Sequence, residues 1–280
     1  MKSSRFVRQL LLVLCVCVIA TGMWAQAAEK EYEPVEGQSG KDVIWLPTAQ
    51  ELGDKMLDIA KLTPEDFVID LGSGDGHTVI TAAKRGARAL GIEYNPDMVA
   101  FSKRNVAKAG VAEKTQFMEK DLFETDFSQA TVLTMFLMPD INLKLRPQIL
   151  DLKPGTRVVS NTFTMGDWNP DETATVDDKK TGCGNYCTAL LWIVPAKVEG
   201  AWKLPQGELT LKQSYQMLSG TFKSGNNNVP VTNGKMTGDL ITFSVGNINY
   251  TGRVRGNSME GTFQAWGSSS PWSAARVREG

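Results

Sequence analysis

Three glycines stand at alternate positions in the stretch VIDLGSGDGHT, residues 68–78, and aspartates accompany them. A glycine-rich turn between a strand and a helix usually binds phosphate, because its bare N–H groups and the helix N-terminus attract anions. Asp70 and Asp75 argue against a phosphate here, since like charges repel in a partly buried pocket. The spacing G-x-G-x-G also differs from the G-x-G-x-x-G of dinucleotide-binding folds. The turn is better suited to a ligand that carries positive charge.

Two more acids stand where predicted strands end. Glu93 closes a predicted strand about 20 residues past the glycine turn, where a nucleotide-binding fold places an acid that accepts from ribose hydroxyls. Asp121 follows the next strand, and there it could accept from an adenine amino group while Leu122 or Phe123 lies against the ring. One such acid would usually be only solvated. Three acids after three successive strands predict a nucleoside pocket.

S-adenosylmethionine suits both the acids and the glycines. Its sulfonium and ammonium groups match the carboxylates, and its own carboxylate can use backbone N–H groups at the start of a helix. The sequence therefore predicts S-adenosylmethionine as the ligand. No metal site is predicted, because His77 is the only histidine in the chain.

Alternating helical and β patterns explain how one pocket collects these residues. Strands that alternate with helices imply a mostly parallel sheet with right-handed crossovers. A capping box, TAQE at residues 48–51, opens the first helix. The predicted strands span residues 67–71, 89–93, 115–118, 131–137 and 157–162, and the predicted helices span residues 48–61, 79–84 and 96–109.

The pattern changes at about residue 197, where short alternating strands separated by Gly/Asn turns begin. The predicted fold class is α/β: a Rossmann-like, mostly parallel sheet with helices on both faces, followed by a small all-β barrel or sandwich domain. Trp202 and Arg276 could pack as the Trp–Arg pair of lipocalins does, although two fixed residues make coincidence the better interpretation. The predicted boundaries are 1–27 for a signal peptide, 28–42 for a linker, 43–196 for the Rossmann-like domain and 197–280 for the β-rich C-terminal domain.

The first residues have the pattern of a secretory leader. Lys2, Arg5 and Arg8 precede an apolar run over residues 10–20, and small residues follow at a cleavage site after Ala27. The run is short for a membrane span, which needs roughly 20 residues. We therefore expect a cleaved leader, a periplasmic or secreted protein, and no stable membrane span after processing; a retained anchor is the less favoured alternative.

The charge of the chain argues against nucleic acid as a partner. The net charge is −1, and loss of the leader would leave 27 basic against 31 acidic residues, a net charge of −4. No segment is dense in lysine and arginine, and phosphate backbones repel an acidic surface. We expect no nucleic-acid binding.

Two cysteines remain outside the predicted leader. Cys183 and Cys187 frame the sequence CGNYC, and an even pair in an oxidising compartment suggests a disulfide. The alternatives are two free thiols or half of a metal site whose other ligands would be carboxylates.

The quoted motifs resemble those of class I S-adenosylmethionine-dependent methyltransferases: DLGSGDG matches their first motif, GIEYNP their second and KDLF their third. The resemblance covers about residues 43–170. VIWLPTAQELGDKML and LKPGTRVVSNTFTMGDW narrow it to the small protein-lysine methyltransferases that act on the ATP synthase c-ring protein and the adenine nucleotide translocase, and their prokaryotic relatives. Residues 46–48 would close over the cofactor. The resemblance implies that the cofactor is bound by Asp70, Gly72, Ser73, Gly74, Gly76, Glu93, Asp121 and Leu122.

Candidates for the chemistry itself are weaker. Asp140, in FLMPD after the fourth strand, could accept a proton from an amine, although a helix N-cap is the better interpretation. His77 could act as a base, but packing at the helix start is the better interpretation. His77 also stands where this family is expected to have arginine.

The predicted function is an exported S-adenosylmethionine-dependent methyltransferase that N-methylates a protein lysine or another amine. Export leaves the supply of the cofactor open, since S-adenosylmethionine is made in the cytoplasm. The alternatives are a non-catalytic nucleoside-binding module, or a protein of the cell envelope whose β-rich domain binds a partner. The methyl acceptor, the role of the β-rich domain and the oligomeric state are not predicted by the sequence.

Overall fold

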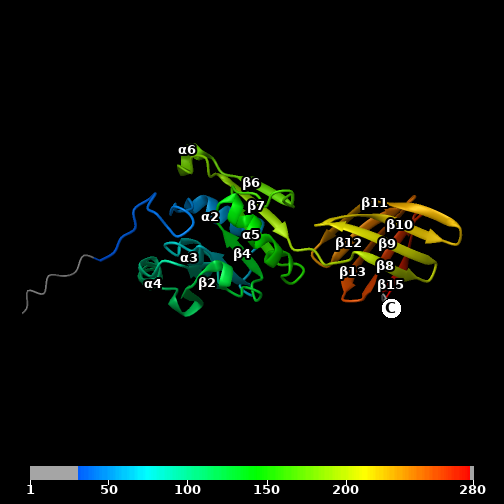
Figure 1. Ribbon diagram of the computed structural model, residues 1–280, viewed down its shortest axis with the longest axis horizontal. Helices are drawn as coiled ribbons and strands as arrows, with labels where there is room; N and C mark the ends of the chain where they lie inside the picture. Colours follow the sequence, from blue (N-terminus) through cyan, green and yellow to red (C-terminus); the bar gives the residue numbers. More distant parts are fainter. Residues whose placement is uncertain (1–30, 278–280) are drawn as a thin grey trace, which may run out of the picture. The chain divides into compact units, whose positions relative to one another are not determined.

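The computed structural model describes residues 31–277 (Figure 1), and the predicted signal peptide, 1–27, lies outside them. The chain divides into a unit of residues 1–33 and a unit of residues 34–280. Among residues 31–277, no helix combines the length and the apolar character needed to cross a bilayer.

A seven-stranded sheet with the order β3-β2-β1-β4-β5-β7-β6 forms the first half of the second unit (Figure 1). The first five strands in this order pair in parallel, and β7 and β6 are antiparallel additions. The strand order reverses between β1 and β4, and such a reversal opens a crevice at the carboxyl ends of the strands. The strands are β1 (Phe67–Leu71), β2 (Arg88–Glu93), β3 (Thr115–Glu119), β4 (Val132–Met135), β5 (Arg157–Asn161), β6 (Glu172–Thr175) and β7 (Thr188–Ile193).

Helices cover both faces of this sheet. Alternate residues of β1 point into different hydrophobic clusters: Ile69 and Leu71 pack in the cluster that holds α5, and Val68 packs in the cluster that holds α2 and α3. Burial on both faces is what a mostly parallel sheet requires. The helices are α2 (Gln50–Ile59), α3 (His77–Lys84), α4 (Pro96–Ala109), α5 (Pro139–Leu150) and α6 (Asp178–Thr181), with 3-10 turns η1 (Ala112–Lys114) and η2 (Leu122–Glu124).

The predicted capping box at residues 48–51 is wrong. The N-cap of α2 is Ala49, which offers no side-chain cap. Thr48 instead uses its hydroxyl oxygen to accept a hydrogen bond from Nδ2 of Asn161, at 3.3 Å. A tertiary contact with the end of β5 thus replaces the local cap.

Eight antiparallel strands close into a barrel in the C-terminal part of the chain (Figure 1). Its interior is filled by buried apolar and aromatic side chains, among them Phe243 and Trp272. The predicted fold class is therefore confirmed, with a closed barrel in place of the open choice between barrel and sandwich. The strands are β8 (Gly200–Leu204), β9 (Gly207–Ser214), β10 (Met217–Ser224), β11 (Asn227–Thr237), β12 (Leu240–Val245), β13 (Ile248–Arg255), β14 (Ser258–Ala265) and β15 (Ser268–Arg276).

The two ends of the barrel sequence meet through Trp202 and Arg276. The Arg276 guanidinium lies 4.3 Å from the centroid of the Trp202 ring. The indole N–H of Trp202 donates to the carbonyl of Val198 at 2.8 Å. The packing of a tryptophan under an arginine, for which coincidence was the favoured interpretation, is thus present and joins the first barrel strand to the last.

The turn between β9 and β10 contacts the sheet domain. The Tyr215 ring stacks on Trp168, with 5.8 Å between centroids and 13° between planes. Its hydroxyl donates to Asp167 at 2.9 Å. At the junction, the backbone N–H of Ala196 donates to the carbonyl of Gly238 at 2.8 Å, and Val198 is fully buried. The chain that connects the two domains is therefore anchored on both sides.

Candidate active site

A cavity opens at the carboxyl ends of β1, β2 and β4, the edge at which this fold binds ligands. Its wall includes most of the residues predicted to bind the cofactor. Residues 38–48 form the facing wall, so part of the predicted linker lies over the cavity. The predicted residues in the wall are Asp70, Gly72, Ser73, Gly74, Glu93, Asp121 and Leu122.

The glycine turn has the backbone conformation that its sequence predicts. Gly72, Gly74 and Gly76 have φ values of +73°, +52° and +79°, a region that residues with a Cβ avoid. A Cβ at Gly74 would lie 2.6 Å from Nε1 of Trp45, and one at Gly76 would lie 2.8 Å from the Phe117 ring. Gly74 therefore keeps the turn bare on the cavity side, while Gly76 is the N-cap of α3 and allows close packing.

Glu93 ties the glycine turn to the end of β2. One carboxylate oxygen accepts from the backbone N–H of Gly74 at 2.9 Å, and the other accepts from the N–H of Asn95 at 3.0 Å. Each oxygen keeps a second lone pair for a ligand hydroxyl. The structure thus places Glu93 beside the turn, as expected of an acid that binds ribose.

Asp70 is the most perturbed acid of the cavity. Burial raises its pKa to about 7, the Thr134 hydroxyl lowers it by donating at 2.6 Å, and the charges of Asp75 and Glu93 raise it further. No cation among residues 31–277 pairs with Asp70 or Glu93. The group that would favour their ionised forms must come from outside the described chain.

Asp121 has a partner that sequence reasoning missed. Lys41 forms an ion pair and hydrogen bond with one oxygen of Asp121, and the other oxygen accepts from the N–H of Phe123 at 2.9 Å. Lys41 holds the pKa of Asp121 below its usual value. Its ammonium also lies 4.6 Å from the centroid of the Tyr94 ring. Lys41 therefore occupies the acceptor predicted for an adenine amino group.

The segment before α2 supplies further wall residues. Trp45 lies against the glycine turn, and Leu46, Pro47 and Thr48 line the cavity beside it. The sequence pointed to residues 46–48 through the family resemblance, but Trp45 and Lys41 stand outside any periodic pattern. A tryptophan and a lysine just before the LPT stretch were the available signal.

The two candidates for proton transfer have different places. Asp140 lies exposed in the first turn of α5, whose N-cap is Met138, and Asp140 does not line the cavity. His77 starts α3 and lines the cavity, and its Nε2 is buried near Gly53 without a hydrogen-bond partner among the described residues. The structure does not bring Asp140 together with the other predicted residues.

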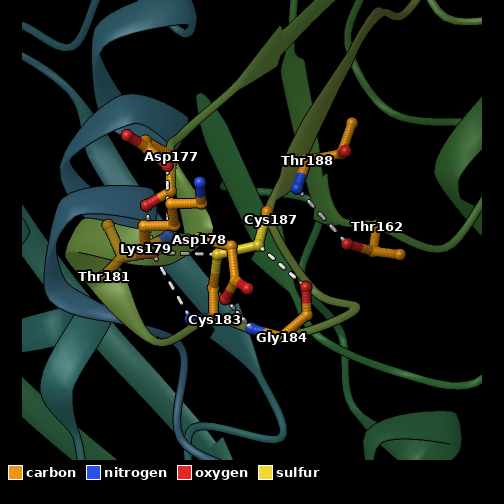
Figure 2. The surroundings of a disulfide bond; sticks show 9 residues. All are labelled: Thr162, Asp177, Asp178, Lys179, Thr181, Cys183, Gly184, Cys187 and Thr188. Atoms are coloured by element: carbon orange, nitrogen blue, oxygen red, sulfur yellow. Dashed lines mark hydrogen bonds between the residues drawn. A yellow bond between two sulfur atoms is a disulfide. The ribbon is translucent and has the colours of Figure 1, made fainter.

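Cys183 and Cys187 are joined by a disulfide, with 5.3 Å between their Cα atoms (Figure 2). Asp178 lies close enough to share a metal with two free thiolates, so the alternative of a carboxylate-completed site has a geometric basis. The disulfide removes both thiolates as ligands. The Asp178 carboxylate instead accepts from the N–H of Gly184 at 2.6 Å.

The cavity fits the groups of S-adenosylmethionine. Asp70 and Glu93 offer unpaired negative charge, and the bare backbone at Gly74 permits close approach. The buried Ser73 hydroxyl has no hydrogen-bond partner among residues 31–277, so a ligand could satisfy it. Strand order, glycine turn and acids together define the fold and site of a class I methyltransferase.

Known proteins agree with this class. A family model described as the ANTKMT methyltransferase domain matches residues 70–172. The chain is 42% identical over 139 residues to a protein-lysine N-methyltransferase of Saccharolobus islandicus, covering 49% of this chain and 86% of that protein. A lysine N-methyltransferase of Mus musculus, named for the ATP synthase c-ring protein, is 37% identical over 107 residues, which are 38% of this chain and 43% of that protein.

A solved structure gives the same result. The RNA methyltransferase from Salinibacter ruber, in complex with S-adenosyl-L-homocysteine, is similar with a TM-score of 0.50 and 42% identity, covering 55% of this chain and 96% of that chain. The chain belongs to the ANTKMT-type methyltransferase family and is an enzyme of that class. Methyltransferases of this family use S-adenosylmethionine.

Proposed function

We propose that this protein transfers a methyl group from S-adenosylmethionine to the side-chain amine of a protein lysine. The observation that carries the proposal is the 42% identity to the Saccharolobus islandicus protein-lysine N-methyltransferase over 86% of its length. The acid-lined cavity supports the methyl donor, and the relatives' names support the acceptor. The chain spans less than half of the mouse relative, so the acceptor does not transfer from that protein directly.

Named residues of this chain would hold the cofactor. Gly74 and Ser73 would contact it through the bare turn, Glu93 through its free lone pairs, and Asp70 through its charge. Asp121 would accept from the adenine amino group, provided that Lys41 shares or releases its oxygen. S-adenosylmethionine supplies an electrophilic methyl group. The protein supplies position and exclusion of water, which contribute most of the catalysis of such a displacement.

The acceptor amine must reach the cavity without its proton. A free lysine has a pKa of about 10.4, so it is charged at neutral pH. Burial beside apolar side chains favours the neutral amine, and Phe136 and Leu137 provide such a surface at the end of β4. We assign no general base, because Asp140 is exposed outside the cavity.

An RNA acceptor is the second candidate, because the Salinibacter ruber relative is described as an RNA methyltransferase. The net charge of this chain is −1 over its full length. RNA affinity depends on cationic side chains that replace counterions, and an acidic surface provides few of them. The charge therefore favours a protein amine.

We also propose that the protein works outside the cytoplasm, in the periplasm or after secretion. The leader-like sequence motivates this, and the disulfide supports it, because disulfides persist in oxidising compartments. The supply of S-adenosylmethionine in that compartment is then part of what the protein requires.

The direct test is a labelling experiment with purified protein and methyl-labelled S-adenosylmethionine. A mixed protein fraction and total RNA serve as separate acceptors, and labelled protein is hydrolysed to amino acids. We expect label in Nε-methyl-lysine. Label in RNA alone would overturn the proposed acceptor. Calorimetric titration with S-adenosylmethionine, S-adenosylhomocysteine and NAD accompanies it, and failure of the first two to bind would overturn the proposed donor.

A further inference from the structure

Three aromatic side chains, which we name the aromatic triad, meet beside the cofactor cavity. Phe136 follows β4 and lines the cavity. Its ring stacks on Phe163 with 6.0 Å between centroids and meets Tyr186 edge to face at 5.2 Å, and Phe163 lies 5.8 Å from Tyr186. All three are half-buried, so each keeps part of its ring accessible. The triad has neither the full burial of a core cluster nor the exposure of surface residues.

The disulfide loop presents Tyr186 to the triad. Tyr186 directly precedes Cys187, and its N–H donates to the carbonyl of Cys183 at 2.9 Å, which closes a tight turn inside the ring formed by the disulfide. The carbonyl of Cys187 accepts from the N–H of Val176 at 3.0 Å. Figure 2 shows this loop against the strand that follows it. Three restraints on five residues fix where the Tyr186 ring lies.

Phe163 is held by an unusual backbone. Thr162 has φ of +60°, a region that costs a β-branched residue about 1–3 kcal/mol. The N–H of Thr162 donates to the carbonyl of Thr188 at 2.7 Å, and the Thr162 hydroxyl accepts from the N–H of Thr188 (Figure 2). Thr188 is the residue after Cys187. The strained turn that aims Phe163 is thus bonded to the end of the disulfide loop.

An unsatisfied acceptor lies next to the same turn. Asn161 is fully buried at the end of β5, and its Oδ1 has no hydrogen-bond partner among the described residues. Its Nδ2 donates to Thr48, a residue of the cavity wall. A buried amide oxygen without a partner requires an explanation, and a donor on a bound molecule is one.

We propose that the aromatic triad is the subsite for the acceptor amine, which takes an alkylammonium or alkylamine side chain, and that the Cys183–Cys187 disulfide positions Tyr186 in it. This inference rests on the proposed function. Ring faces attract ammonium groups and their N-methyl groups, and apolar edges pack on the alkyl stem. Asn161 would accept a hydrogen bond from an N–H of the amine. Phe136 connects the subsite to the cavity of the methyl donor.

The test measures binding of a product-like cation. The probe is Nα-acetyl-Nε-trimethyl-lysine amide, and its control is the neutral compound in which a quaternary carbon replaces the nitrogen. Full-length mature protein saturated with S-adenosylhomocysteine is titrated with each, and binding is followed by NMR. We expect the cation to bind about tenfold more tightly than the neutral compound, since the charge adds a cation–π attraction to equal packing.

Variants locate the probe. Tyr186→Leu, Phe163→Leu and the double change Cys183→Ser with Cys187→Ser should each weaken binding of the cation about fivefold or more, and Tyr186→Phe should restore it. Trp266→Leu is the matched control, because Trp266 is 91% exposed in a turn of the barrel and should have no effect. S-adenosylhomocysteine affinity and the melting temperature show that each variant is folded.

The outcomes separate the two proposals. Equal binding of the cation and the neutral compound, or unchanged binding in both Tyr186→Leu and Phe163→Leu, would overturn the subsite. Weakened binding in Tyr186→Leu with normal binding in the double cysteine variant would overturn the role of the disulfide. If S-adenosylhomocysteine itself fails to bind the parent protein, the proposed function fails instead.

Discussion

At the scale of single residues, Asp70 connects the chemistry of the cavity to stability. Its pKa is raised to about 7 chiefly by burial, whereas the unfolded chain releases the same proton near pH 3.8. Between these values the folded state holds a proton that the unfolded state has lost, so this acid makes the protein less stable as the pH rises. The destabilisation is complete above about pH 7.

We therefore expect Asp70→Asn to be more stable than the parent protein at about pH 8, by roughly 1.4 kcal/mol for each unit by which the pKa is raised. The advantage should shrink toward pH 5, because the parent acid is then mostly neutral in the folded state. Thermal unfolding of both proteins at several pH values measures it. A difference that does not change with pH would contradict the raised pKa.

The same acid should couple cofactor binding to proton release. A cationic ligand favours ionised Asp70, so affinity for S-adenosylmethionine should increase as the pH rises through about 7. Calorimetry near neutral pH in buffers of different ionisation enthalpy counts the released protons. Asp70→Asn should release fewer protons and bind more weakly, whereas equal release by both proteins would exclude Asp70 as the source.

Glu93 provides a second test of the pocket. Its two oxygens accept from the N–H groups of Gly74 and Asn95, and Glu93→Gln would place an amide N–H₂ against one of them. Hydrogen bonds to charged groups contribute roughly 1.5–3 kcal/mol, so cofactor affinity should fall about ten- to hundredfold. The melting temperature should fall as well, because the turn loses a backbone contact. Unchanged affinity by calorimetry would place the ribose elsewhere.

At the scale of elements, local patterns predicted the parallel strands and the helix α4, because apolar runs and a Pro start are strong signals. The helix start at Thr48 was predicted wrongly, since its hydroxyl serves Asn161 on β5 rather than its own helix. The antiparallel strands β6 and β7 were not predicted, although the apolar run TALLWI of β7 is typical of a buried strand.

The site divides in the same way. The acids Asp70, Glu93 and Asp121 follow strands, and the carboxyl ends of parallel strands meet at one edge, so their proximity could be predicted. Lys41 and Trp45 come from a segment without periodicity, and only the tertiary fold places them in the cavity. Tyr186 belongs to the aromatic triad for the same reason.

The disulfide element has a modest expected effect on stability. Its cysteines are four positions apart, and the chain-entropy model gives about 2 kcal/mol for so short a loop. The double change Cys183→Ser with Cys187→Ser should therefore lower the free energy of unfolding by about this amount or less. Mass spectrometry of the unreduced parent protein should find no alkylatable thiol at either position, and two such thiols would show that the disulfide does not form.

At the scale of the whole molecule, the barrel is attached more firmly than its separate core implies. Its interior is a hydrophobic cluster of its own, which favours the predicted boundary between residues 196 and 197. The junction is nevertheless hydrogen-bonded and buried at Ala196 and Val198, and Tyr215 covers Trp168. Proteases need exposed, mobile chain, so we expect limited proteolysis to spare the junction.

Truncation after Ala196 tests the boundary directly. The sheet domain keeps both hydrophobic clusters that flank its sheet and the whole cofactor cavity, so it should fold and bind S-adenosylhomocysteine with nearly the affinity of the full chain. It should melt at a lower temperature, because it loses the stacked ring on Trp168 and the hydrogen bond to Asp167, together on the order of 2 kcal/mol. Tyr215→Ala in the full chain is the matched control and should reproduce most of that loss. A truncated chain that is unfolded by circular dichroism, beside a folded Tyr215→Ala protein, would show that the sheet domain depends on the barrel as a whole and that residues 43–196 are not a domain.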